Sequence, residues 1–272
     1  MTISAVTRCL SLLELLANQS EPIELSDIAE RLDLPASAAH RLVTTLVSQG
    51  WVHQDPSSHK YALSLRMSML AFRNLDGRNL PHTVQAILQK LATETHEYCR
   101  LAILEGQNLI WIARAQGALT GLRYDPDMGE DIVLHATANG KAWLSTLPEE
   151  EALATVYSRG FNTGQKVGPN CVRSIDELRA QLSETRKRGF ATSVEEAELG
   201  TGAVAVTFRS GPESDAPVAG TISVAGPIVR ITPARWPELV EALQRAAGEL
   251  ARVWPMRSRQ RGSSRLPPSM ME

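Results

Sequence analysis

Two short helices separated by a tight turn near the N-terminus constrain the fold of this chain more than any other feature. Apolar side chains recur at helical spacing over Ser26–Leu32 and again over residues 36–50. Only a short turn fits between the two runs, because Pro35 holds the residue before it in extended geometry and is itself favoured at a helix start. Ser26 is expected to cap the first helix, and Gly50 to end the second. The pattern predicts a helix-turn-helix.

The second of these helices has one polar and one apolar face. At about 100° per residue, six polar side chains share one arc: Ser37, His40, Arg41, Thr44, Thr45 and Ser48. The opposite arc is apolar and holds Ala39, Leu42, Val43, Leu46 and Val47. The polar arc contains no carboxylate, which phosphate would repel, and its side chains can bond base edges and phosphates. An ordinary amphipathic helix also has a solvated face. The neighbouring elements must therefore distinguish a DNA-binding helix from an ordinary one.

Those neighbours complete the outline of a winged helix. Residues 4–18 form a further amphipathic helix, and two strand-like runs, Trp51–Gln54 and Lys60–Leu63, flank a turn-rich segment. We therefore expect a DNA-binding winged helix-turn-helix over residues 1–63. His59 and Lys60 at the hairpin are candidates for phosphate contacts, although each alone could be a plain surface residue. A linker helix is expected within residues 64–80.

From Pro81 onward the pattern becomes that of a mixed α+β domain with helices on a mostly antiparallel sheet. Strands are expected at residues 98–104, 108–115, 119–124, 203–208 and 218–224. Helices are expected at residues 81–97, 136–147, 149–157, 174–188 and 234–253. This second domain is placed at 81–255. Residues 256–272 contain four arginines among Ser, Gly and Pro, so a disordered tail is predicted there.

Composition favours a cytoplasmic protein but does not indicate a nucleic-acid partner. The start lacks the features of a signal peptide, no stretch is long and apolar enough to span a bilayer, and the three cysteines are far apart. The net charge is −2, and residues 1–75 hold six Lys/Arg against seven Asp/Glu. A basic domain is the usual mark of a DNA binder. The alternative is a ligand-sensing scaffold whose winged helix binds protein.

No motif points to an enzyme, a cofactor or a metal. Gly140-Lys141 lacks the glycine that a phosphate loop needs five positions earlier, where His135 stands. His135 has no Cys, Asp or second His nearby at ligand spacing, so a packed or helix-capping histidine is the expected role. We expect no catalytic activity, no cofactor and no metal site.

The chain resembles the IclR family of bacterial regulators along most of its length. The N-terminal stretches that carry the resemblance are AVTRCLSLLELLA, IELSDIAERLDLPASAAHRLVTTLVSQGWV and YALSLRMSML. The later stretches are MGEDIVLHATANGKAWLS, RKRGFATSVEEAELG and VAGTISVAGPIVRIT. Members of the family usually open the recognition helix with Lys-Ser-Thr, whereas Ala36 and Ala38 flank Ser37 here. Two polar contacts common in the family are therefore missing.

The resemblance implies a winged helix-turn-helix joined by a linker helix to a GAF-like effector-binding domain. It further implies a homo-oligomer, a dimer or tetramer, that binds a pseudo-palindromic double-stranded DNA operator. Such regulators control catabolic operons in response to small organic acids. We expect no membrane partner.

The resemblance also places an effector pocket between the sheet and the segment His135–Lys141. The residues implied are His135, Ala136, Thr137, Asn139 and Gly140, with Ala203, Ser223 and Ala225 on the strands. Ala203 and Ala225 stand near positions where acid-binding relatives have a cysteine and a serine, so a larger or more aromatic acid is expected. Arg123 or Arg114 could pair with its carboxylate, although an exposed structural ion pair is the plainer interpretation of each.

Overall fold

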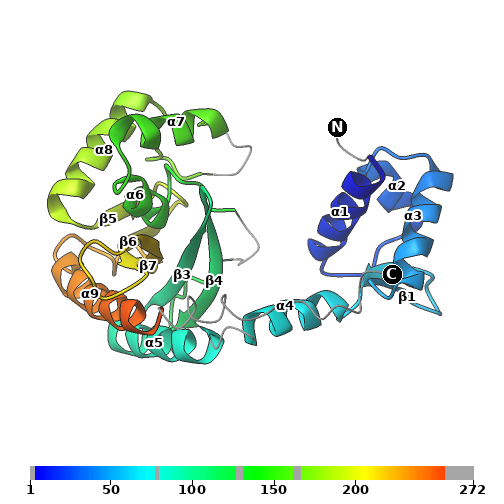
Figure 1. Cartoon of the computed structure of the whole chain (residues 1–272), viewed down its shortest axis with the longest axis horizontal. Coiled ribbons are helices and arrows are strands. Elements are labelled where there is room, and N and C mark those ends of the chain that lie inside the picture. The colour runs from blue at the N-terminus through cyan, green and yellow to red at the C-terminus, as the bar shows by residue number, and fades with distance from the viewer. Residues whose placement is uncertain (1–3, 77–79, 127–130, 162–166, 255–272) are drawn as a thin grey trace, which may run out of the picture. The chain divides into compact units, whose positions relative to one another are not determined.

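The structure, a computed structural model, describes residues 4–76, 80–126, 131–161 and 167–254. The chain divides into two compact units, residues 1–77 and 78–272 (Figure 1). The predicted tail at 256–272 lies outside the described residues.

The first unit contains the predicted three helices and hairpin. Its elements are α1 (Ser4–Ala17), α2 (Leu25–Arg31), α3 (Ala36–Ser48), β1 (Val52–Gln54), β2 (Tyr61–Leu63) and α4 (Arg66–Asp76). The hairpin is antiparallel, and Ile23 adds an isolated bridge to Tyr61. Apolar side chains from the helices and both strands form one core: Leu12, Leu16, Ile23, Ile28, Val43, Leu46, Val52 and Tyr61.

The turn between α2 and α3 is as tight as the sequence requires. Asp33 has a positive φ of 49°, and the Leu34 N–H donates to the Ala29 carbonyl at 2.9 Å. The predicted capping role of Ser26 is wrong, because α2 begins earlier, after Glu24, and Ser26 lies inside the helix. Extended backbone at Glu24 and the bridge at Ile23 set this earlier start.

The hairpin turn is held by a single carboxylate. Asp55 Oδ1 accepts from the backbone N–H groups of Ser57 and Ser58 at 3.0 and 2.7 Å, and also from both hydroxyls. These hydrogen bonds lower the pKa of Asp55 well below its ordinary value. His59 closes the turn with a positive φ of 58°. The wing is therefore a defined turn and not a loose loop.

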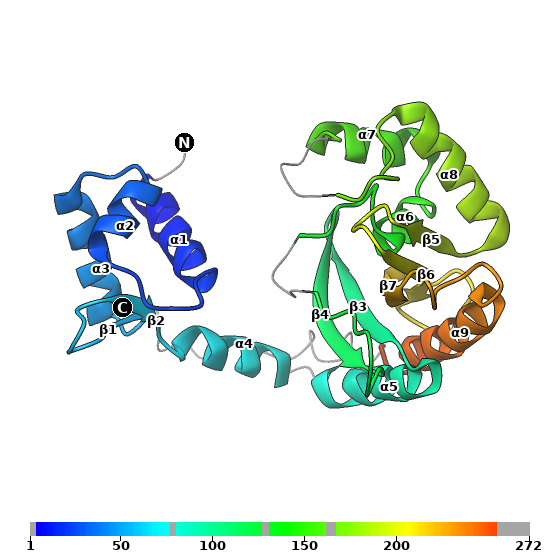
Figure 2. The ribbon, with the colours of Figure 1, turned by 180° about the vertical axis from the view of Figure 1, so that it is seen from behind.

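The second unit is a five-stranded antiparallel sheet with helices on both faces. Its strands are β3 (Tyr98–Glu105), β4 (Asn108–Gln116), β5 (Ala191–Val194), β6 (Thr201–Arg209) and β7 (Val218–Pro227). They lie in the order β4-β3-β7-β6-β5. Its helices are α5 (Leu80–Thr95), α6 (Ala138–Leu144), α7 (Glu149–Arg159), α8 (Ile175–Arg188) and α9 (Trp236–Val253). Figure 2 shows α5 and α9 on one face and α6, α7 and α8 on the other.

Each face of the sheet has its own apolar core. The α5–α9 face packs residues such as Leu88, Leu101 and Leu243. The other face packs Leu134, Trp143 and others against α7 and α8. A third, smaller contact consists of alanines on α6, β5 and β6. A helix can approach a sheet closely only where side chains are this small, and this contact sets the place of α6.

Two sequence expectations for this unit are wrong. Residues 119–124 form no strand, because Gly121 has a φ of 79° and the Gln116 side chain folds the segment back by donating to the Tyr124 carbonyl. The strand Ala191–Val194 was not expected, because it is only four residues long and starts just after the helix that ends at Arg188. It pairs with β6 and extends the sheet by one strand at that edge.

One buried carboxylate ties the start of β3 to the segment between β7 and α9. Glu97 is 1% exposed. Its two oxygens accept from Arg230 Nε and Nη2 at 2.7 and 2.8 Å, and Oε1 also accepts from Arg235 Nη1 at 2.9 Å. Arg230 also donates to the Leu122 carbonyl, so the same cluster holds the 117–124 loop.

We expect Glu97→Ala to lower the free energy of unfolding by about 2–3 kcal/mol. That is below the usual cost of breaking a buried ion pair, because the arginines keep some contact with water. Urea unfolding of the full chain measures the loss. Glu94→Ala is the matched control, since Glu94 pairs with Arg245 at an exposed site, where loss of the pair costs less than about 1 kcal/mol. Equal losses in the two variants would contradict the role given to Glu97.

Candidate functional sites

The exposed face of α3 is the one that the sequence predicted. Ser37, His40, Arg41, Thr44, Thr45 and Ser48 are all exposed. Ala39, Val43 and Leu46 are buried in the core of the unit. Val47, expected on the apolar side, is 37% exposed and lies beside the polar face. The helix therefore presents neutral and cationic groups to solvent and no carboxylate.

Two hydroxyls on this face bond to their own helix. Thr45 Oγ1 donates to the Arg41 carbonyl at 2.8 Å, and Ser48 Oγ donates to the Thr45 carbonyl at 2.8 Å. Donation of this kind occupies the hydroxyl proton and leaves only acceptor capacity for a partner. Ser37, His40, Arg41 and Thr44 are consequently the better placed donors.

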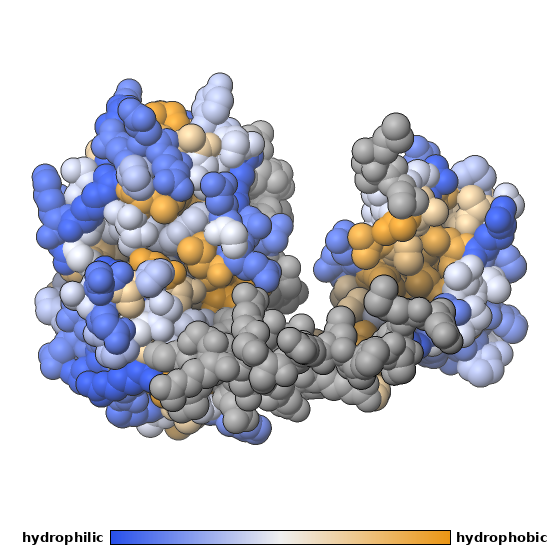
Figure 3. Space-filling model, viewed as in Figure 1, coloured by the Kyte–Doolittle hydropathy of each residue, from blue (hydrophilic) through white to orange (hydrophobic). Residues whose placement is uncertain are grey.

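An apolar groove of about 550 Å³ lies beside α3, between it and α1. Arg41 and Thr45 form its edge toward the polar face. Val6 and Leu10 on α1 are 52% and 54% exposed there. Figure 3 shows hydrophobic side chains gathered over α1 on this face of the first unit. A contiguous apolar surface of this kind is typical of an interaction site.

At the wing, His59 is exposed, whereas Lys60 forms a weak ion pair. The Lys60 ammonium lies 3.7 Å from Glu24, with both side chains open to water. An exposed pair of this kind is weak, so phosphate could displace Glu24.

In the second unit, a small cavity lies under the start of α6. Pairing between neighbouring strands brings polar side chains of the sheet together there. Arg100 pairs with Ser223 across β3 and β7, and Ser193 pairs with Ala203 across β5 and β6. Directly paired residues point to the same face of a sheet. The residues that line the cavity are Arg100, Trp111, Tyr124, Thr137, Ala138, Asn139, Ser193, Ala197, Thr201, Gly202, Ala203, Ser223 and Ala225. None of them is acidic.

Arg100 gives this cavity its charge. The residue is only 8% exposed, and its guanidinium carbon lies 4.6 Å from the centre of the Trp111 ring and 5.2 Å from that of Tyr98. Its Nε also donates to Tyr98 Oη at 3.3 Å. Aromatic rings on which a guanidinium stacks hold it in place, so its position in the cavity wall is fixed.

Five of the nine residues expected to contact an effector line this cavity: Thr137, Asn139, Ala203, Ser223 and Ala225. His135, Ala136, Gly140 and Arg123 do not line it. Arg123 is exposed. Arg114 lies 3.6 Å from Asp125 in an exposed ion pair, as expected.

Two of the excluded residues, Ala136 and Gly140, instead position the helix. The Ala136 carbonyl accepts from Ser193 Oγ at 2.8 Å. A Cβ on Gly140 would lie 2.3 Å from the Leu134 carbonyl oxygen, so only glycine permits this approach. The helix cap is Thr137 and not His135, since Thr137 Oγ1 accepts from the Gly140 N–H at 3.1 Å. His135 is packed against Phe161.

Sequence reasoning missed Arg100, Trp111, Tyr124 and Ser193. The sequence did contain a signal for Arg100. It is a charged residue within an otherwise apolar strand, and charged residues are rarely buried without a role.

Lys141 takes no part in this cavity. It is 2% exposed, and its Nζ lies 2.6 Å from both Glu196 Oε2 and Gln181 Oε1. The lysine is therefore bound within the protein and does not face a phosphate.

Among the residues that the structure describes, no cluster of His, Cys, Asp or Glu could hold a metal ion. None of the described helices is long and apolar enough to cross a membrane.

Comparison with known proteins extends over both units. The model of the bacterial transcriptional regulator IclR C-terminal domain matches residues 72–252, and that of the IclR helix-turn-helix domain matches residues 5–56. The chain is 32% identical to the acetate operon repressor of Salmonella typhimurium over 249 residues, which covers 91% of this chain and 89% of that protein.

Solved structures share the fold. The IclR-type regulator of Alicyclobacillus acidocaldarius has a TM-score of 0.78 at 24% identity and covers 94% of this chain and 100% of that one. An IclR homologue of Microbacterium hydrocarbonoxydans, complexed with 4-hydroxybenzoate, has a TM-score of 0.74 at 24% identity, covering 92% of this chain and 98% of that one. This chain, with its N-terminal helix-turn-helix and its α+β domain, belongs to the IclR family of bacterial transcriptional regulators.

Proposed function

We propose that the chain regulates a catabolic operon by inserting α3 into the DNA major groove, under the control of a small organic acid bound in the second unit. The observation that carries the DNA-binding part is the exposed, carboxylate-free face of α3 with Arg41 on it. Arginine can form two parallel hydrogen bonds to a guanine edge. The name of a relative, the acetate operon repressor, supports the choice of a catabolic operon.

Two chains would act together on a pseudo-palindromic operator, so that two copies of α3 reach successive faces of the major groove. Exposed apolar side chains on α1 and near α4 support self-association. They include Val6, Leu10, Leu65, Met69 and Leu70, which are between 43% and 78% exposed. Burial of such surface stabilises a dimer in proportion to the area removed from water.

The proposed effector site is the small cavity around Arg100. Its guanidinium would pair with a carboxylate, and Ser223 and Asn139 would complete the polar wall. The cavity measures about 50 Å³, whereas a cavity of about 150 Å³ is the size known to take benzene. This favours a short carboxylate here over the aromatic acid that the sequence suggested. The solved homologue with 4-hydroxybenzoate supports only the idea that this fold can hold a carboxylic acid.

We expect Arg41→Ala to weaken operator binding by about 1–3 kcal/mol, roughly 5- to 150-fold, if Arg41 forks onto a guanine. Fluorescence titration of DNA from upstream of the gene, at two salt concentrations, measures the loss. Wild-type binding should fall steeply with salt.

The control is Arg31→Ala, which removes the same charge from a side chain held by Gln19 at 2.9 Å. Equal effects of the two variants would contradict a specific role for Arg41. Salt-insensitive binding, or none to any genomic fragment, would contradict DNA binding and favour a protein partner for the winged helix.

We expect at least one carboxylate in a series from acetate to succinate to raise the unfolding temperature of the full chain, while its amide does not. Arg100→Gln should reduce the affinity for that acid about 10- to 150-fold, the worth of a hydrogen bond to a charged group being about 1.5–3 kcal/mol. Arg179→Gln removes an exposed arginine of α8 that pairs with Glu149 and Asp176; it is the control and should change nothing. If Arg100→Gln binds the acid as tightly as the wild type does, Arg100 is not part of the binding site.

A further inference from the structure

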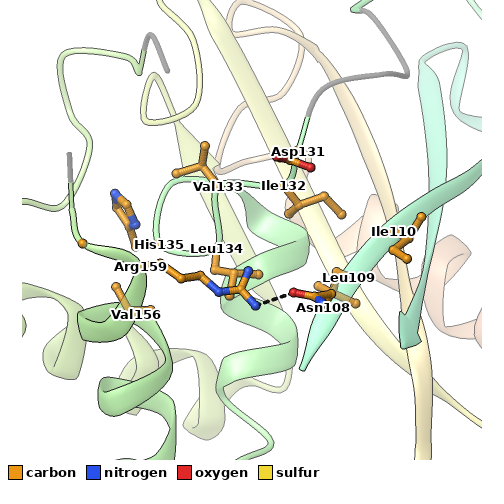
Figure 4. Close-up of a pocket in the computed structure, with 11 residues that line it drawn as sticks. Asn108, Leu109, Ile110, Asp131, Ile132, Val133, Leu134, His135, Val156 and Arg159 are labelled. Carbon is orange, nitrogen blue, oxygen red and sulfur yellow. Dashed lines mark hydrogen bonds between the residues drawn. The ribbon is translucent and has the colours of Figure 1, made fainter. Parts of the chain in front are cut away.

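A second, larger cavity of about 410 Å³ lies beside α7, away from the residues assigned above. It is formed by the first residues of β4, the segment 131–135 before α6, and the end of α7 (Figure 4). Buried aliphatic side chains form its floor: Leu109, Ile132, Leu134 and Val156. The volume exceeds the roughly 150 Å³ that takes a benzene ring, so a ring-sized apolar group fits.

Arg159 holds a guanidinium at the mouth of this cavity. It is exposed, and its Nη2 donates to the Gln107 carbonyl at 2.5 Å and to Asn108 Oδ1 at 2.7 Å. In Figure 4 its side chain reaches across the cavity to Asn108. Both bonds use one nitrogen, and Nε and Nη1 have no acceptor among the described residues. The N–H groups of Nε and Nη1 point to different sides of the guanidinium, so either nitrogen can donate a single charge-assisted hydrogen bond to a carboxylate.

His135 adds a buried polar group with an unmet hydrogen bond. The residue is 2% exposed, and its Nε2 has no partner among the residues that the structure describes. The other ring nitrogen is engaged with the backbone of Phe161. Burial, and then the charge of Lys141, lower the pKa of His135, so the ring is neutral at pH 7 and Nε2 is an acceptor. A buried acceptor left unpaired is costly, and a ligand donor would satisfy it.

We propose that this cavity is a second ligand site, which takes a hydroxylated carboxylic acid with a ring-sized apolar body. The carboxylate pairs with Arg159, the hydroxyl donates to His135 Nε2, and the ring lies on the aliphatic floor. Asp131 at the rim disfavours a second carboxylate on the same ligand. The site is separate from the Arg100 cavity, with which it shares no lining residue.

Calorimetric titration of the full chain with 4-hydroxyphenylacetate tests the proposal. Phenylacetate lacks the hydroxyl, and 4-hydroxyphenylacetamide lacks the charge. Both should bind at least tenfold more weakly than the hydroxy acid. Arg159→Gln should reduce the affinity for 4-hydroxyphenylacetate at least tenfold and bring it close to that of the amide. The unfolding temperature of the unliganded variant should stay near that of the wild type, because the side chain is exposed.

Two controls locate the ligand. Arg179→Gln removes an exposed arginine of α8 that pairs with Glu149 and Asp176, and it should leave the affinity unchanged. Arg100→Gln should leave it unchanged as well. Loss of binding in Arg100→Gln but not in Arg159→Gln would overturn the proposal and place the acid in the small cavity. Equal affinity for phenylacetate, or no binding by the wild type at millimolar acid, would also overturn it. No DNA is present, so the outcome does not depend on operator binding.

Discussion

The close contact between α6 and the sheet determines the geometry of the second unit. Small side chains make that contact: Ala138, Ala142, Ala191 and Ala205. Because the backbones approach closely, Asn139 Nδ2 reaches Thr221 Oγ1 at 2.9 Å and Ser193 reaches the Ala136 carbonyl. Larger side chains here would lift the helix, break both bonds and open the small cavity. Residues 131–135 run straight into this helix, so the walls of both cavities belong to one continuous segment. A ligand in either cavity would act on the same helix start.

In the proposed mode of DNA binding, recognition depends on where charge is placed on the first unit and not on its total. The first unit has a slight acidic balance, yet α3 has no carboxylate on its exposed face. Screening limits the reach of exposed charges to about 10 Å at 0.1 M salt, so acids elsewhere on the unit would weaken the proposed phosphate contacts of α3 only slightly. The weak pair between Lys60 and Glu24 at the wing is an exception, because the proposed contact of Lys60 with phosphate would require this ion pair to break.

Much of the fold could be predicted from local patterns. The helix-turn-helix follows from Pro35 and the periodicity around it, because these are short-range constraints. The edge strand Ala191–Val194 could not be, because a run of four residues directly after a helix is too short to show a strand pattern, although it pairs with the next strand along the chain. In the proposed effector site, Ser223 and Asn139 were expected through a family resemblance. Arg100 was missed because register across β3, β4 and β7 brings it to the cavity, and register is not visible in one sequence.

Control of DNA binding by the effector requires a coupling free energy between the two units, and linkage makes this coupling reciprocal. The most direct test measures the affinity of the full chain for an active carboxylate, first free and then saturated with its operator fragment. The coupling proposed here predicts a change of roughly 5- to 150-fold, about 1–3 kcal/mol. The same factor should appear in the DNA affinity when the carboxylate is added. Equal carboxylate affinity for the free and the DNA-bound protein would contradict regulation through this site.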